Sequence, residues 1–365
     1  MTVGAPWCSR PASCRSLLAT LVAGLAIVHG GAAAGQLDHG RCPGDCSGDA
    51  LVSASELVVG VHVALGTAAL ERCAAFDADG SGQVEIDELV AGVASAVDGC
   101  PIGIVAEKAF FDTLNGVRDR ADEAVQLLEQ AVARDPQDGR SYFLLGMMHL
   151  FQLSRENTDI ADPSERAKAE IEQASTALDA AVPLLTGDTR VPGFRAGATY
   201  VRGVLLGELE TERLGLTQLR DAFALYPLFN TFDFIGTVPA IVAPGDPLLA
   251  EAVSYLEYAL SPEGLARCTP RICFNEGKAP HNIEGSFLLF GDIFAKAGDR
   301  DRAQMYYQGS ASFAAASGWR FRASIEERLA TLDQRIALYQ DGDPANDPPV
   351  LGRVGTESCA YCHYR

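Results

Sequence analysis

The chain has 365 residues, with 48 acidic against 29 basic side chains and a formal net charge of −19 at pH 7. This charge excludes nucleic acid and anionic membranes as expected partners, because both are themselves negatively charged. The sequence contains no phosphate-binding loop, nucleophile elbow, metalloprotease helix or dinucleotide fingerprint. An enzyme is therefore less expected than a protein without chemistry of its own or one that only transfers electrons.

The first 34 residues have the features of a signal peptide. Two arginines precede the apolar run 17–28, and three alanines follow it ahead of Gly35. The apolar run is too short to span a bilayer. We therefore expect the chain to be exported, to the periplasm or the extracellular space, without a membrane span.

The cysteines that follow the signal peptide are even in number, which in an exported protein predicts disulfides. Four of them flank the region 42–100 and allow three different pairings: Cys42, Cys46, Cys73 and Cys100. Cys268 and Cys273 bracket a short loop that a disulfide would close. The last two, Cys359 and Cys362, belong to a separate motif.

Residues 77–88 form a calcium loop of the EF-hand type, with an oxygen at each position where the ion needs one. Gly82 stands where the loop turns sharply with positive φ. The predicted ligands are the side chains of Asp77, Asp79, Ser81, Glu85 (through water) and Glu88, with the carbonyl oxygen of Gln83. The sequence therefore predicts a calcium site here.

A second copy of this loop lies upstream at an offset of 32 residues. Its predicted ligands are Asp45, Ser47, Asp49, the carbonyl oxygen of Leu51, Ser53 and Glu56. The duplication continues into the next helix, where Gly60-Val61 matches Gly92-Val93. Ala50 stands where the other copy has Gly82, and a left-handed turn at alanine costs about 1 kcal/mol. We expect the first loop to bind calcium more weakly.

Residues 42–100 resemble a dockerin, the duplicated EF-hand module that attaches extracellular enzymes to cohesin domains. The resemblance implies calcium binding and places partner recognition at loop positions ten and eleven, here Ala54-Ser55 and Ile86-Asp87. The two pairs differ, and Asp87 is unlike the small or hydroxylated residues of that family, which argues against a cohesin partner. Ordinary paired EF-hands are the alternative, although Pro43-Gly44 leaves no room for an entering helix.

Apolar residues at three- and four-residue spacing predict an all-α domain over residues 105–340. Two stretches resemble tetratricopeptide repeats, helical hairpins that stack into an α-solenoid. The first stretch carries Ala124, Leu128, Ala131, Asp135-Pro136, Tyr142, Leu145 and Gly146, and the second Phe287, Phe290, Gly291, Phe294, Ala303 and Tyr307. Residues 155–271 depart from the pattern. The resemblance implies an irregular solenoid whose surface binds a protein partner.

The tail, residues 341–365, begins with an Asp-, Pro- and Gly-rich stretch that we interpret as a solvated linker over 341–356. It ends with Cys359-Ala360-Tyr361-Cys362-His363, the sequence to which haem is attached in c-type cytochromes. Two thiols one helical turn apart can each bond one vinyl group of a porphyrin, while His363 ligates the iron. A disulfide or half of a zinc site are the alternatives.

His281, in a loop before a predicted repeat helix, is the first choice for a distal haem ligand. Its alternative role is that of a loop histidine hydrogen-bonded to Glu284 or to backbone. The other candidates are His149, Met147, Met148 and Met305, and the aromatic residues Phe313, Trp319 and Phe321 either line a haem groove or fill a seam between helices. Two hypotheses follow: a calcium-binding haem c protein that transfers electrons to a redox partner, or a calcium-dependent scaffold without haem.

Overall fold

The computed structural model describes residues 41–156, 159–266, 279, 281–352, 354 and 358–364. The predicted signal peptide and the pair Cys268 and Cys273 lie outside these residues. Throughout the described part of the chain the secondary structure is helical, without strands, which confirms the all-α class.

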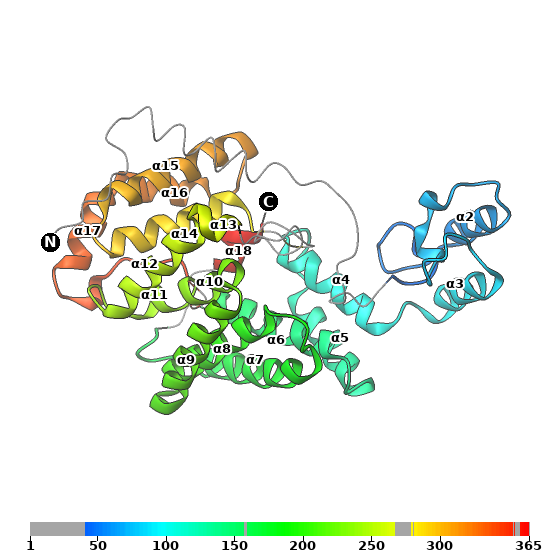
Figure 1. Ribbon diagram of the computed structural model, residues 1–365, viewed down its shortest axis with the longest axis horizontal. Helices are drawn as coiled ribbons and strands as arrows, with labels where there is room; N and C mark the ends of the chain where they lie inside the picture. The colour runs from blue at the N-terminus through cyan, green and yellow to red at the C-terminus, as the bar shows by residue number, and fades with distance from the viewer. Residues whose placement is uncertain are drawn as a thin grey trace.

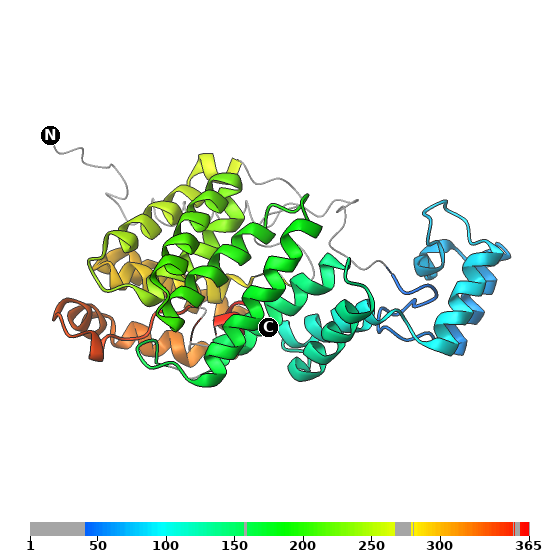
Figure 2. The same ribbon diagram turned by 90° about the horizontal axis from the view of Figure 1, so that it is seen from below.

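Residues 42–100 form a small module that stands apart from the rest of the molecule and is joined to it at the start of α4 (Ile102–Leu114) (Figures 1 and 2). The module has two α-helices and two short 3-10 helices. These are α2 (Ala54–Ala64), η1 (Leu70–Arg72), η2 (Ala74–Phe76) and α3 (Ile86–Asp98). Each predicted calcium loop leads directly into an α-helix.

Two disulfides cross-link the module and settle the pairing that the sequence left open. Cys42 is bonded to Cys100, which joins the two ends of the module. Cys46 is bonded to Cys73, which ties the first loop to the segment before the second. The buried core of the module is small, and domains of this size commonly need such cross-links or bound metal to fold.

Phe76 fills the space between the two helices of the module and is fully buried. A Cβ atom on Gly60 of α2 or on Gly92 of α3 would lie 2.4 Å from its ring. These two glycines are equivalent in the internal duplication. Glycine weakens a helix by about 1 kcal/mol relative to alanine, so the close approach of the aromatic ring explains why both copies keep it.

The first half of the body consists of long helices that pack against their neighbours in sequence. They are α4, α5 (Ala121–Arg134), α6 (Gly139–Arg155), α7 (Glu165–Leu184), α8 (Val191–Leu206) and α9 (Leu209–Leu225). The apolar positions of the first predicted repeat are buried, including Ala124 and Leu128. A Cβ on Gly146 would lie 2.6 Å from Leu178, so α6 and α7 touch closely there.

Residues 155–271, which the sequence predicts to depart from the repeat pattern, include the long helices α7, α8 and α9. The described part of this region also holds four shorter helices with proline in their first turn, where its missing N–H costs nothing. These are α10 (Pro227–Ile235), α11 (Val238–Ile241), α12 (Pro247–Ala259) and α13 (Pro262–Ala266).

The second half of the body is built on the hairpin of α14 (Ile283–Lys296) and α15 (Arg300–Ser317), followed by α16 (Arg322–Ala330) and α17 (Leu332–Gln340). The second predicted repeat lies on this hairpin. A Cβ on Gly291 would lie 2.3 Å from the Tyr307 ring, and Ala303 is fully buried. The small residues thus stand where the two helices touch.

The body contains two hydrophobic cores. The N-terminal core is formed mainly by α4 to α8, and the C-terminal core mainly by α10, α12 and α14 to α17. The last helix, α18 (Ser358–His363), contacts α14 from the second half and α4 and α6 from the first. Figure 1 shows it in the middle of the body. The end of the chain therefore joins the two halves.

The interpretation of residues 341–356 as a solvated linker is wrong for 348–352. Val350 and Leu351 are buried in the C-terminal core, although η3 (Pro344–Asn346) before them is exposed. Three groups from the body hold this segment. Asp292 accepts from the Leu351 amide at 3.0 Å, Arg335 donates to the Pro349 carbonyl at 2.9 Å, and the Tyr339 hydroxyl donates to the Pro348 carbonyl at 2.8 Å.

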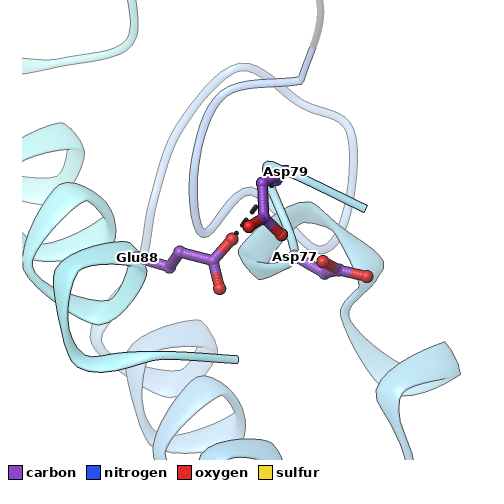
Figure 3. Close-up of side chains that lie close together, drawn as sticks. All are labelled: Asp77, Asp79 and Glu88. Carbon is purple, nitrogen blue, oxygen red and sulfur yellow. Dashed lines mark hydrogen bonds between the residues drawn. The ribbon is translucent and has the colours of Figure 1, made fainter. Parts of the chain in front are cut away.

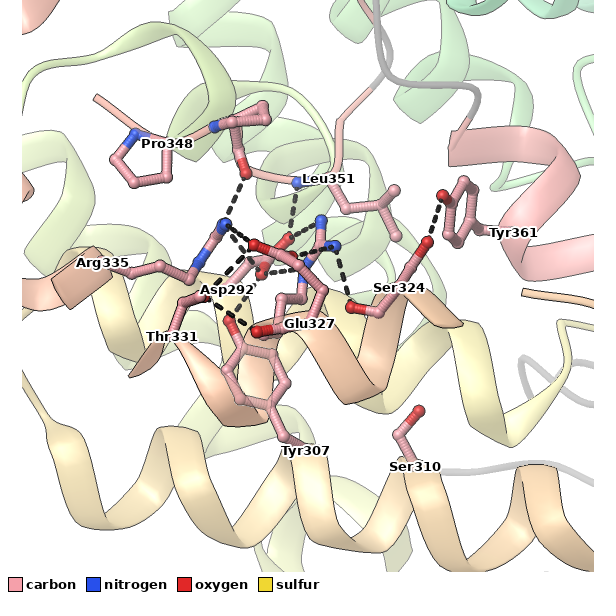
Figure 4. A network of polar contacts seen from close by, with 12 residues as sticks. Asp292, Tyr307, Ser310, Ser324, Glu327, Thr331, Arg335, Pro348, Leu351 and Tyr361 are labelled. Carbon is pink, nitrogen blue, oxygen red and sulfur yellow. Dashed lines mark hydrogen bonds and ion pairs between the residues drawn. The ribbon is translucent and has the colours of Figure 1, made fainter. Parts of the chain in front are cut away.

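Asp292 is the centre of this network and is fully buried (Figure 4). Its carboxylate accepts two hydrogen bonds from Arg328, at 2.7 and 3.1 Å, and one from the Tyr307 hydroxyl at 2.6 Å. Burial would raise the pKa of Asp292, but Arg328 and Arg335 outweigh it and hold that pKa below its ordinary value. The network anchors the chain that leads to α18.

Among the described residues, no single helix combines the length and apolarity needed to cross a membrane. The consecutive helices α3 and α4 meet that test only as a pair, and they are bent by 68°.

Candidate functional sites

The second predicted calcium loop, residues 77–88, gathers three carboxylates. Asp77, Asp79 and Glu88 each offer an oxygen within 4.8 Å of the others, and Figure 3 shows Asp79 and Glu88 facing each other. Asp77 Oδ1 is buried and has no hydrogen-bond partner. A buried carboxylate oxygen normally finds a donor or a cation, so the observed geometry fits a hard, oxygen-binding ion such as Ca²⁺.

The remaining predicted ligands of this loop lie beside the triad in sequence and are exposed. The Ser81 hydroxyl donates to the Gln83 carbonyl at 3.3 Å, which brings two of the predicted oxygens together. Glu85 is the N-cap of α3 and is tied to Glu88 through a capping box. The side chains that the sequence assigned to the ion therefore stand on one continuous loop.

The last carboxylate closes both loops in the same way. Glu88 accepts from the amides of residues 78, 79 and 85. Glu56 accepts from the amides of the equivalent residues 46, 47 and 53. The internal duplication thus extends from sequence to hydrogen bonding.

The first loop adopts the same turn despite its alanine. Ala50 has a φ of 65° where Gly82 has 85°, and no other described residue except glycine has positive φ. Asp45 supports this turn, since its carboxylate accepts from the amides of Gly48, Asp49 and Ala50. The first loop is therefore shaped like the second, at the conformational cost that alanine carries in this region.

Electrostatics favour cation binding at both loops. Hydrogen bonds from the Ser81 amide and hydroxyl hold the pKa of Asp79 below its ordinary value. Burial would raise the pKa of Glu56, but hydrogen bonds from Ser53 and Ser47 outweigh it and lower that pKa. Arg72 is the only lysine or arginine between residues 42 and 100. These carboxylates are therefore ionised at neutral pH in a region with little positive charge to neutralise them.

The predicted haem-attachment motif lies on α18, between the two cores of the body. Cys362 is 7% exposed and belongs to the C-terminal core, whereas Cys359 is half-buried against the N-terminal core. Burial raises the pKa of the Cys362 thiol well above its ordinary value. No disulfide joins the two cysteines.

His281 and His363 lie side by side. Their ring centroids are 4.5 Å apart and their planes are inclined by 37°. Phe232 of α10 stacks on His281, with ring centroids 5.0 Å apart. The structure thus brings together the predicted proximal residue and the first choice for a distal one, from opposite ends of the second half of the body.

Two of the other distal candidates, His149 and Met148, are held in other parts of the body. His149 is buried and its Nδ1 lies 2.8 Å from Glu170 Oε2. Met148 is fully buried in the N-terminal core. Glu284, considered as a partner of His281, accepts a hydrogen bond from the Ser317 hydroxyl at 2.6 Å.

The four metal-binding side chains of the motif region do not surround one point. They are Cys359, Cys362, His363 and His281. Within the described part of the chain, Asp77, Asp79 and Glu88 are the only group of three that places its ligand atoms within 4.8 Å of one another. A tetrahedral zinc site needs four ligands around one centre. Because the ligand atoms of this region do not gather in that way, the arrangement is unlike a zinc site. Haem c would need two thiols and an imidazole, without such a gathering.

The aromatic set predicted near the haem divides into two. Phe321 stacks on Tyr361 of the motif at 4.1 Å, and Trp319 meets the same ring edge-on at 5.8 Å. Phe313 instead packs on Phe287 at 5.9 Å, in the seam between α14 and α15. The two residues after α15 therefore border the motif, and the one within α15 does not.

Sequence reasoning missed Phe232 and Asn282 beside the motif. Asn282 precedes a helix and is visible as an N-cap, but its bonds to α18 join segments far apart in the chain. No local signal announces such a contact.

No protein-family model, curated protein or solved structure matches this chain.

Proposed function

We propose that this is an exported calcium-binding protein whose helical body carries one covalently attached haem c and transfers single electrons to a protein partner. The observation that carries the proposal is the approach of His281 to His363, with ring centroids 4.5 Å apart, beside the two cysteines of the attachment motif. A motif of five residues is short, and a second imidazole beside it supports the haem interpretation over a chance match.

The chain's own residues divide the task of holding the group. Cys359 and Cys362 would form the covalent bonds, and His363 and His281 would ligate the iron. Haem c would supply a reversible one-electron couple when bound. Ligation by both histidines would favour electron transfer over catalysis.

The spacing of the two rings requires an adjustment. Two imidazoles that bind one metal ion stand further apart than the present 4.5 Å between the ring centres. Binding of the group would therefore require His281 to move away from His363, and its place in the loop before α14 would allow that movement.

We propose that calcium is structural in this protein. The two loops bind the ion through the ligands named above, the second more tightly because it has more carboxylates and a glycine at its turn. The two disulfides of the module support an oxidising compartment, such as the periplasm or the extracellular space. Covalent haem attachment outside the bacterial cytoplasm agrees with that location.

The body is proposed to act as a tetratricopeptide-like scaffold that presents the haem to its redox partner. Its successive helical hairpins and the small residues where they touch support this reading. A scaffold without haem is the second candidate. It is favoured by the packing of α18 between the two cores, its hydrogen bonds from Asn282 and the burial of Cys362.

Replacement of the distal histidine tests the proposal. In protein produced with a haem-maturation system, His281→Ala should convert a six-coordinate low-spin spectrum into a high-spin one and open the iron to added cyanide. Met305→Leu removes another candidate ligand and serves as the matched control, with no change expected. A low-spin spectrum retained in His281→Ala would contradict the assignment of His281.

A further inference from the structure

Asn282 joins the motif helix to the body with nearly all its polar groups. Its backbone amide donates to the Cys362 carbonyl at 2.6 Å. Its side-chain amide donates to the carbonyls of Tyr361 at 2.9 Å and Tyr364 at 3.1 Å. Its side-chain oxygen accepts from the Gly285 amide at 2.6 Å. One residue therefore closes the end of α18 and begins α14.

These hydrogen bonds pair backbone groups at the end of α18 and the start of α14 that have no partner within their own helix. The last carbonyls of a helix lack intrahelical donors, and the first amides lack acceptors. Asn282 donates three hydrogen bonds to the end of α18, while its Oδ1 caps α14. α18 has only six residues, too few to be stable as an isolated helix, so its placement depends on such external contacts.

The two helices also approach closely at this point. A Cβ on Gly285 would lie 2.3 Å from the Tyr361 carbonyl oxygen. The first turn of α14 therefore lies directly against the backbone of α18 beside the Asn282 side chain. Because His281 directly precedes Asn282, and His363 lies between two of the bonded carbonyls, these three hydrogen bonds tie together the backbone segments that carry the two rings. We call the three bonds the clamp.

We propose that Asn282 is the positioning residue that sets His281 against His363. The proposal deepens the haem-binding function and rests on it, although the clamp itself exists without the cofactor. Asn282 acts by fixing the backbone of the distal residue to that of the motif, through the three hydrogen bonds that it donates to the carbonyls of Tyr361, Cys362 and Tyr364.

Asparagine is the residue that this clamp requires. Aspartate caps a helix as well as asparagine does, so Asn282→Asp keeps the bond from Gly285. It lacks the two N–H donors and places a carboxylate against the carbonyls of Tyr361 and Tyr364. The substitution therefore removes the side-chain bonds to α18 while it keeps the N-cap of α14. Asp246→Asn is the matched control. Asp246 is the N-cap of α12 and accepts from the Leu248 amide, so this variant makes the opposite Asp-to-Asn change at a helix cap away from α18.

The first measurement uses the full-length protein without haem. Alkylation of Cys362, resolved from the other cysteines by peptide mapping, reports how often α18 leaves its site. Loss of two hydrogen bonds should raise the rate about tenfold or more in Asn282→Asp and leave it unchanged in Asp246→Asn. Equal rates in wild type and Asn282→Asp would overturn the clamp.

The second measurement uses the haem-loaded protein. Asn282→Asp should populate a high-spin form and shift the pH at which the low-spin spectrum is lost, whereas Asp246→Asn should match the wild type. An unchanged spectrum together with faster alkylation would overturn the positioning role and leave a structural one. Wild-type protein that acquires no haem would refute the proposed function, and the alkylation rates would still decide whether the clamp exists.

Discussion

The disulfide-linked module, residues 42–100, and the helical body are stabilised in different ways. The module has a small core centred on Phe76, two disulfides and two loops of acidic residues. The body has two extensive cores joined by α18 and the segment before it. Most exposed large apolar residues lie on the module, among them Val58, Val61, Leu65, Val90, Val93 and Val97.

The difference shows what each part depends on. A domain that leaves so much apolar surface in water gains little from burial and relies on cross-links and bound ions. The body relies on packing and on a few buried polar contacts between distant segments. Removal of an ion or a disulfide should therefore unfold one part alone, and loss of a buried contact should affect the other.

The largest effect is expected in the body. Asp292→Asn removes the buried counter-ion of Arg328 and Arg335, which then have only the more distant and exposed Glu327, so the free energy of unfolding of the body should fall by about 3–5 kcal/mol. Asp333→Asn is the matched control, because Asp333 pairs with Arg300 on the surface and exposed pairs contribute little to stability. Urea unfolding measures the free energy of unfolding of both variants. An equal decrease in the two would contradict the difference expected between the buried and the exposed ion pair.

Loss of the disulfide that joins the module's ends should act on the module alone. Cys42→Ser with Cys100→Ser opens a link that spans 58 residues, and should lower the module's free energy of unfolding by roughly 3 kcal/mol. Hydrogen exchange resolved by region checks this. Faster exchange throughout α5 to α8 would show that the two parts do not unfold independently.

The two calcium loops should differ in the affinity that they provide. Asp77→Ala with Glu88→Ala should weaken binding to the tighter site by about a hundredfold or more, near 2.7 kcal/mol. Asp45→Ala with Glu56→Ala removes the equivalent pair and should mainly affect the weaker site. Calorimetric titration separates them, and an unaltered tight site in the first variant would refute the assignment.

Acid should produce the smallest and most gradual effect. The pKa of Asp292 is lower in the folded protein than in the unfolded chain, so its contribution to stability is complete above the unfolded value of about 3.9 and is lost as the pH falls toward the folded one. The free energy of unfolding of the body, measured with urea, should fall below about pH 4. An equal loss of stability in acid after the substitution Asp292→Asn would assign the effect to other groups.

Local features of this protein could be predicted from its sequence. The oxygen-bearing positions of residues 77–88 and the helices that follow each loop depend on neighbours in the chain. The repeated Gly60 and Gly92 were visible as a pattern, yet the reason for them, the ring of Phe76, came only from the structure. The disulfide pairing was open for the same reason, since sequence spacing does not fix contacts.

Contacts between distant segments could not be predicted. The stretch around Leu351 has the composition of a loop and is nevertheless buried, because Asp292, Arg335 and Tyr339 bind its backbone. The choice of His281 rested on its position before a helix, without a spacing argument that linked it to His363. Binding of haem and of calcium stays a prediction.

The most direct test is whether the chain carries covalent haem. Protein produced in a host that matures c-type cytochromes should show a Soret band that survives denaturation, and haem should remain on the C-terminal peptide that contains Cys359 and Cys362. Colourless protein from that host, with both thiols of this peptide unmodified, would contradict the account.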